Sequence, residues 1–359
     1  MNWLAIGLMV ALNAVGQSPV GQTPAGQSQE DKAQSLNSQG NRLSEVGKYV
    51  EAESPYREAI EIWRSMGPAY EGHTAGSLLN YGVALSGLGQ RPAAAKVLEE
   101  ALALHRKALG PNHHRTLSNM NLLASNYLML SETVKARPLL TAALEIGRQY
   151  FPDDIQTARS LEGMSNLLIK DDRPAEALPL AAEALGIAIR STGEESVDTA
   201  LAYTSVAEAH RYLGAPERAL PLYRKARMLY EKAVGPDHPR VATLLSQEGL
   251  LLMNEGKLNM AEKAMLQCLN ALRKSCPNCG VEISLAENNL GLLRLKQKRY
   301  EEANEALTAS VELREKFAAQ PGPELADALS NLAVAREKLK LFDDAARLNN
   351  RAQLLRKYR

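Results

Sequence analysis

Small side chains recur along this chain at an almost constant interval. Eight alanines form the series, with successive spacings of 42, 42, 41, 42, 42, 42 and 42 residues: Ala52, Ala94, Ala136, Ala177, Ala219, Ala261, Ala303 and Ala345. A fixed period of this length is typical of proteins built from stacked structural repeats. We therefore predict eight repeats, and we number each one so that its alanine stands at repeat position 20.

Two further positions of the repeat are always small. Position 8 lies twelve residues before the alanine and is occupied by Gly40, Gly82, Ala124, Ser165, Ala207, Gly249, Gly291 and Ala333. Position 27 lies seven residues after it and is occupied by Ala59, Ala101, Ala143, Ala184, Ala226, Cys268, Ser310 and Ala352. Antiparallel helices can cross closely only where side chains at the crossing are small. Each repeat is therefore expected to be a helix hairpin.

Larger residues flank the small positions, and glycines mark the turns. Position 24 carries Tyr56, Leu98, Leu140, Ala181, Tyr223, Met265, Leu307 and Asn349, which are expected to pack beside the small residues for the most part. Position 15, where a helix end commonly requires a positive φ, carries Gly47, Gly89, Gly214 and Gly256, with Asp172, Lys298 and Lys340 in other repeats. Abundant Ala and Leu, with no sustained alternation of polar and apolar residues, predict helices almost throughout.

This pattern resembles the tetratricopeptide repeat, in its 42-residue variety found in kinesin light chains and many bacterial proteins. The resemblance rests on the small residues at positions 8, 20 and 27, and on inter-repeat turns such as Gly110-Pro111-Asn112-His113 and Gly235-Pro236-Asp237-His238. It covers about residues 30–359 and implies an all-α, right-handed solenoid of about eight hairpins. The family implies a fold far more specifically than it implies a function.

The resemblance also implies which surface binds a ligand. In this family, positions 2, 6, 9 and 13 of the first helix face the concave groove of the superhelix. The polar residues there are the candidate peptide-binding residues: Asn80, Arg159, Asn166, Lys170, Tyr212, Gln247, Asn254, Asn289, Lys296 and Asn331. Amide side chains can donate to and accept from a peptide backbone, and Lys or Arg can meet a carboxylate. The alternative is that each is a solvent-exposed surface residue with no role in binding.

Cys276 and Cys279 have the spacing of a redox or metal motif. No second pair of Cys or His completes a zinc site, and the two residues fall in an inter-repeat turn. The preferred interpretation is therefore a local disulfide or two unreactive thiols. Cys268 occupies position 27 and is expected to pack in the core. His113 and His238 occupy equivalent turn positions and are interpreted as turn elements. We expect no catalytic residues, no metal and no cofactor.

The amino terminus differs from the repeats. An apolar run from Trp3 to Val15 is followed by a Gln, Ser, Pro and Gly tract, which predicts a signal peptide over residues 1–16 and a flexible linker over 17–29. The run is too short for a stable transmembrane helix. A cleaved leader would make the protein exported, periplasmic or secreted. A cytoplasmic or loosely membrane-anchored protein is the alternative.

Charge and repeat content together favour a protein-binding role. The chain has 42 Lys and Arg against 41 Asp and Glu, a balance that disfavours nucleic acid as a partner. We expect a scaffold or adaptor that holds a protein or peptide in the groove. The alternatives are a regulatory or sensory module that binds a small peptide signal and, less favoured, a thiol redox or metal site at Cys276 and Cys279. The partner and the oligomeric state are left open.

Overall fold

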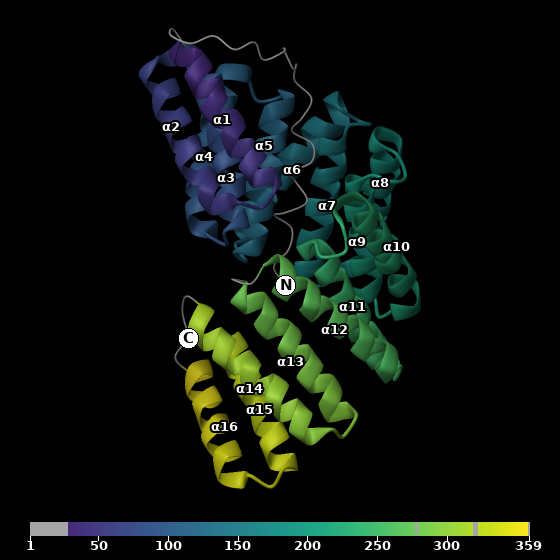
Figure 1. The fold of residues 1–359 in the computed structure, drawn as a ribbon. Coiled ribbons are helices and arrows are strands. Elements are labelled where there is room, and N and C mark those ends of the chain that lie inside the picture. The colour runs from purple at the N-terminus through teal and green to yellow at the C-terminus, as the bar shows by residue number, and fades with distance from the viewer. Residues whose placement is uncertain (1–27, 277–278, 319–321, 358–359) are drawn as a thin grey trace. The chain divides into compact units, whose positions relative to one another are not determined.

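The chain is built from α-helices. The computed structural model describes residues 28–276, 279–318 and 322–357, and over these ranges it contains α-helices, one short 3-10 helix at Pro68–Tyr70 and no β-strand (Figure 1). The predicted signal peptide, 1–16, and the predicted linker up to residue 27 lie outside the described residues. The predicted all-α fold of repeated helix hairpins is confirmed.

Each repeat contributes a first and a second helix. The first helices are α1 (Gln29–Glu45), α3 (Glu71–Gly87), α5 (His114–Met129), α7 (Ile155–Lys170), α9 (Val197–Tyr212), α11 (Pro239–Asn254), α13 (Gly280–Lys296) and α15 (Pro323–Lys338). The second helices are α2 (Tyr49–Ser65), α4 (Arg91–Leu109), α6 (Thr133–Tyr150), α8 (Pro174–Thr192), α10 (Pro216–Val234), α12 (Leu258–Ser275), α14 (Tyr300–Phe317) and α16 (Phe342–Lys357). From the second repeat to the eighth, position 13 is the last residue of the first helix.

Contacts along the chain group into two compact units, Met1–Ala215 and Pro216–Arg359. The first unit contains the described helices α1–α9, and the second contains α10–α16. Within each unit, every helix packs against the next one along the chain. The first helices of neighbouring repeats also pack against one another, as α1 does with α3 and α11 with α13. The first unit therefore stacks four hairpins and α9, and the second stacks α10 and three hairpins.

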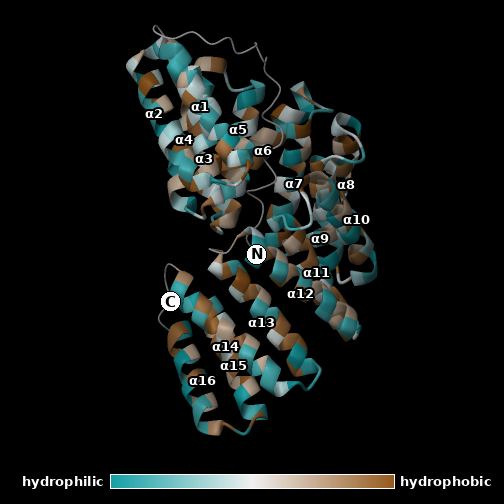
Figure 2. Cartoon of the chain, viewed as in Figure 1, coloured by the Kyte–Doolittle hydropathy of each residue, from teal (hydrophilic) through white to brown (hydrophobic). Residues whose placement is uncertain are grey.

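The recurrent small residues lie where the helices approach most closely. All eight residues of the position-20 series are at most 1% exposed. A Cβ atom added to Gly82 would lie 2.7 Å from Leu98, and one added to Gly291 would lie 2.5 Å from Leu307. These partners occupy position 24 of the same hairpin, so the predicted contact between positions 8 and 24 is confirmed. Figure 2 shows the resulting bands of hydrophobic and hydrophilic residues along the helices.

The turn inside every hairpin has the same backbone conformation. All seven residues predicted at position 15 have a positive φ, including Asp172 at 60° and Lys298 at 61°. Ser131, at the same position of the third repeat, also has a φ of 61°, and the sequence reading did not single it out. A left-handed residue at this point lets the chain reverse after the first helix ends. Glycine supplies this conformation without strain, and Ser, Asp or Lys adopts it at some cost.

We expect the substitution Gly82→Ala to destabilise the chain and Gly76→Ala to stabilise it. Both glycines lie in α3, and replacing a helical glycine by alanine favours the helical conformation by about 1 kcal/mol. A Cβ atom added to Gly76 has nothing within 4 Å, whereas one added to Gly82 overlaps the side chain of Leu98. Overpacking of this kind costs about 1–3 kcal/mol. Thermal unfolding monitored by circular dichroism would measure both; equal gains would contradict the close contact.

Candidate functional site

The candidate peptide-binding residues all lie on first helices, which line the inner side of each unit. First helices of successive repeats pack side by side, whereas no two second helices of successive repeats pack to a comparable extent among the described residues. In a stack of hairpins, the row with the closer spacing lies on the inside of the curve. We call the surface formed by positions 2, 6, 9 and 13 of the first helices the inner face.

Three asparagines of the inner face bridge neighbouring first helices. The side-chain amide of Asn331 donates to Oδ1 of Asn288 at 2.9 Å, that of Asn289 donates to Oγ of Ser246 at 3.3 Å, and that of Asn80 donates to Oδ1 of Asn37 at 3.4 Å. Each donor occupies position 6 and each acceptor occupies position 5 of the preceding repeat.

Burial of these asparagines differs along the chain. Asn80 and Asn289 are buried, with 9% and 6% exposure, and Asn331 is half-buried. At least one amide proton of each side chain is therefore used to join repeats. These three residues stabilise the stack in addition to any role toward a ligand.

Arg159 is also engaged inside the protein. Its guanidinium lies 2.8 Å from the carboxylate of Asp198, which joins α7 to α9, and the side chains are 5% and 9% exposed. Removing one partner of a buried ion pair typically costs about 3–5 kcal/mol because the other charge is left uncompensated. The structure thus gives Arg159 a structural contact between repeats.

The remaining candidates are more accessible. Lys170, Asn254 and Lys296 are exposed, while Asn166 and Gln247 are half-buried. Lys338, which ends α15, is exposed as well. In the second unit, position 13 therefore presents Asn254, Lys296 and Lys338 at the ends of three successive first helices.

Tyr212 ends α9 in the first unit. Its side chain is 38% exposed, and the guanidinium of Arg211 lies 4.1 Å from the centre of its ring. The exposed part of the inner face thus carries amides and ammonium groups in one unit, and a lysine with a stacked tyrosine in the other.

Sequence reasoning missed the residues that partner the inner-face side chains. Asn37, Ser246 and Asn288 each precede their partner by 43 residues, one more than the usual repeat length. In the first unit a related contact joins α5 to α7, where Asn121 donates to the carbonyl of Gln156 at 2.8 Å and accepts from Ser160 at 2.8 Å. A search for polar pairs at this spacing would have found the three amide bridges.

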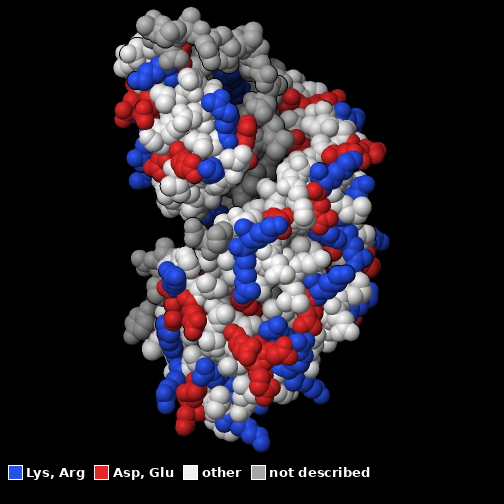
Figure 3. Space-filling model, in the orientation of Figure 1, with Lys and Arg blue, Asp and Glu red and all other residues white. Residues whose placement is uncertain are grey.

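Charge of both signs covers the surface. Figure 3 shows Lys and Arg interspersed with Asp and Glu over the visible face, without a field of a single sign. Several pairs join second helices of adjacent repeats, including Arg148 with Glu183 at 2.7 Å. Exposed pairs of this kind contribute little stability individually. The mixed charge agrees with the balance of Lys and Arg against Asp and Glu in the sequence.

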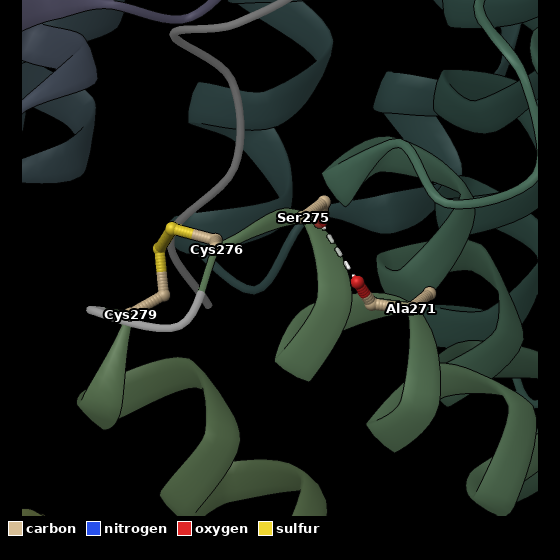
Figure 4. Close-up of a disulfide and its surroundings, with 4 residues drawn as sticks. All are labelled: Ala271, Ser275, Cys276 and Cys279. Atoms are coloured by element: carbon tan, nitrogen blue, oxygen red, sulfur yellow. Dashed lines mark hydrogen bonds between the residues drawn. A yellow bond between two sulfur atoms is a disulfide. The ribbon is translucent and has the colours of Figure 1, made fainter.

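Cys276 and Cys279 are joined by a disulfide in the structure. Cys276 follows α12 directly, and Cys279 immediately precedes α13, so the bond lies at an inter-repeat turn (Figure 4). Ser275, at the end of α12, donates to the carbonyl of Ala271 at 2.8 Å. Cys268 is 3% exposed, and burial raises the pKa of its thiol to about 12, which keeps the thiol protonated and unreactive.

The predicted turn histidines cap helices. His113 and His238 precede α5 and α11, and Nδ1 of each accepts a hydrogen bond from the backbone amide two residues later, at 3.1 and 3.2 Å.

In the described part of the chain, no three His, Cys, Asp or Glu side chains gather as a metal site. Among the helices that the structure describes, none has the length and apolar character to span a membrane.

Comparison with known families agrees with this architecture. Residues 33–66, 73–149, 156–232, 198–274 and 288–317 match tetratricopeptide repeats. The chain belongs to the tetratricopeptide repeat family. A relative from Arabidopsis thaliana, the protein kinesin light chain-related 3, is 28% identical over 200 residues, which cover 55% of this chain and 30% of the relative. The match thus spans less than a third of that relative's length.

Three solved structures share the fold. The apo form of the quorum sensor NprR from B. thuringiensis has a TM-score of 0.66 and 13% identity, and it covers 92% of this chain and 89% of its own. A Rap protein complexed with competence and sporulation factor has a TM-score of 0.59 and 15% identity, covering 92% and 99%. BtubC (BKLC) from P. vanneervenii has a TM-score of 0.53 and 18% identity, covering 67% and 91%.

We expect His238 to make these repeats less stable in mild acid. Burial, together with the positive charge of Arg240, lowers the pKa of His238 to about 4. The unfolded imidazole has a pKa of about 6.5, so between these values the unfolded chain binds a proton that the folded chain does not. The free energy of unfolding therefore falls as the pH drops from about 6.5 to about 4.

The variant His238→Asn tests this expectation, because Asn also caps helices but does not titrate. Urea unfolding at pH 7.5 and pH 5 should show a smaller loss of stability for the variant than for the natural chain. Ser196→Asn changes the cap of α9 without removing an imidazole and serves as the control. An identical pH dependence in all three proteins would contradict the role of His238.

Proposed function

We propose that this tetratricopeptide protein is a scaffold or adaptor that holds a segment of another protein, or a peptide, against the inner face. The observation that carries the proposal is the exposed set of hydrogen-bonding and charged side chains at the ends of successive first helices, Lys170 in the first unit and Asn254, Lys296 and Lys338 in the second. The proposal includes no catalytic activity. The repeats themselves supply the binding surface.

The chemistry of the inner face suits an extended segment with acidic side chains. An ammonium group offers three donors and no acceptor, so Lys296 and Lys338 would bind carboxylates or backbone carbonyls. Asn254, Gln247 and Asn166 can both donate and accept, which matches the alternating groups of a peptide backbone. Successive first helices would place such contacts at regular intervals along the ligand.

We expect substitution of the exposed lysines to weaken peptide binding. A library of random dodecapeptides displayed on phage would be selected on the full chain, and affinities of the recovered peptides measured by fluorescence polarisation. Lys170→Ala, and the double variant Lys296→Ala with Lys338→Ala, should each weaken the peptides that use their unit. The loss expected for the double variant is about tenfold, or about 1.4 kcal/mol.

Lys263→Ala is the matched control, because Lys263 is exposed on the second helix α12 and lies outside the inner face. Peptide affinity that is unchanged in every inner-face variant would contradict binding at the inner face. A loss in the control as large as in the double variant would point to general charge attraction.

A second candidate is a regulatory or sensory module that binds a small peptide signal. Two neighbours in fold favour it: one is described as a quorum sensor, and the other was solved with competence and sporulation factor. Each matches 92% of this chain. A sensor must respond to its ligand by a change in the packing of its repeats.

We expect a sensory role to be visible in small-angle X-ray scattering. The selected peptides would be added at saturating concentration to the full chain, and the radius of gyration compared with that of the free protein. A sensor should change its radius of gyration, because the pitch of the stacked repeats shifts on binding. Scattering curves that are the same with and without every peptide would contradict the sensory role and remain consistent with the adaptor role.

A further inference from the structure

A small pocket opens between α3, α4 and α5 in the first unit. It is lined by Val83 and Ser86 from α3, Arg91 from α4, and Leu122, Ser125, Asn126 and Met129 from α5. Its volume is about 280 Å³ including the part open to solvent, and its enclosed part has room for about one water-sized group. Val83, Leu122, Ser125 and Met129 occupy positions 9, 6, 9 and 13, so the pocket belongs to the inner face.

Asn126 departs from the repeat pattern at this pocket. It occupies position 10, where the second repeat and the fourth to eighth repeats carry Ala84, Leu167, Ala209, Leu251, Leu293 and Ala335. Its side chain is only 4% exposed. The first repeat carries the exposed Arg42 at this position. A buried polar residue is costly unless its hydrogen bonds are satisfied.

The hydrogen bonds of Asn126 fix its orientation. Its amide nitrogen donates to the carbonyl oxygen of Arg91 at 3.3 Å and to Oγ of Ser86 at 3.4 Å. A carbonyl oxygen can only accept, so the nitrogen must face Arg91 and Oδ1 must lie on the other side. Within the described protein, Oδ1 is buried and accepts no hydrogen bond, and the hydroxyl of Ser125 is buried and unpaired as well.

We propose that this pocket receives the hydroxyl group of a serine or threonine side chain in the bound segment. The inference rests on the proposed binding of a peptide at the inner face. A hydroxyl has the size of one water molecule, donates one hydrogen bond and accepts others. It would donate to Oδ1 of Asn126 and exchange a hydrogen bond with Ser125. The methyl group of a threonine would contact Val83, Leu122 or Met129.

The lining also disfavours the other donors that a peptide offers. No Asp or Glu lines the pocket, so the ammonium of a lysine would enter without a compensating charge from the lining. A carboxylate could approach Arg91, but it would meet the acceptor Oδ1 of Asn126 at close range. An alkyl side chain would fill the space and leave both buried polar groups unpaired. A neutral hydroxyl satisfies them together.

The test combines a change in the peptide with a change in the protein. Dodecapeptides selected from the displayed library on the full chain should share a Ser or Thr at one position. Replacing that Thr by Val, which has the same shape, should weaken binding to the natural chain by about tenfold. In the variant Asn126→Leu, whose Leu matches the residue at position 10 of three other repeats, Thr and Val peptides should bind equally or Val should bind better.

Further variants keep the test decisive. Ser125→Ala should reduce the preference for Thr and serves if Asn126→Leu does not fold, which circular dichroism would show. Asn259→Leu changes an exposed asparagine of the second helix α12, outside the inner face, and should leave the preference intact. Equal binding of Thr and Val by the natural chain, or an equal preference in Asn126→Leu, would mean that the pocket holds only a structural water; the inference then fails while the inner face still binds peptides. Failure to select any peptide would overturn both proposals.

Discussion

The close approach of paired helices at small residues is the contact on which this structure depends. Gly82 lies against Leu98, and Gly291 lies against Leu307, at distances that leave no room for a side chain on the glycine. The same contact joins Gly40 to Tyr56 and Gly249 to Met265, so these hairpins have similar shapes and can stack in register. Burial of the eight alanines at position 20 follows from this stacking.

Stacking brings first helices side by side, and polar residues settle between them. Amide bridges such as Asn331 to Asn288 and the buried ion pair of Arg159 with Asp198 join one repeat to the next. Such contacts are directional, so they fix the register between repeats in a way that apolar packing alone does not. The inner face therefore has two layers, an inner polar seam that stabilises the stack and an exposed row that is free to meet a ligand.

This division bears on what the protein can bind. The exposed row contains the lysines that end α7, α13 and α15, together with Asn254 at the end of α11. In the first unit, Asn126 adds a buried acceptor to a pocket whose walls are mostly apolar. Each unit thus presents its own set of polar side chains on its inner face. Tetratricopeptide repeats with different residues at these positions would select different ligands.

The sequence by itself determined the fold of the repeats. Small residues at positions 8, 20 and 27, and turn residues at position 15, act locally within one hairpin, and their spacing is visible without coordinates. The same local rule gave the turn roles of His113 and His238, and the left-handed conformation of Ser131 follows from the same spacing. The resemblance to the tetratricopeptide repeat, together with helix periodicity, implied which positions form the inner face.

Only the tertiary structure decided which inner-face side chains form hydrogen bonds or ion pairs with other residues of the protein. Asn80, Asn289 and Arg159 look like exposed ligand-binding residues in the sequence, but their partners lie on the neighbouring repeat, and burial depends on how the repeats meet. The pocket at Asn126 likewise arises from three helices that meet in space. Periodicity reports which way a side chain points from its own helix; the distance to groups on other helices is set by packing.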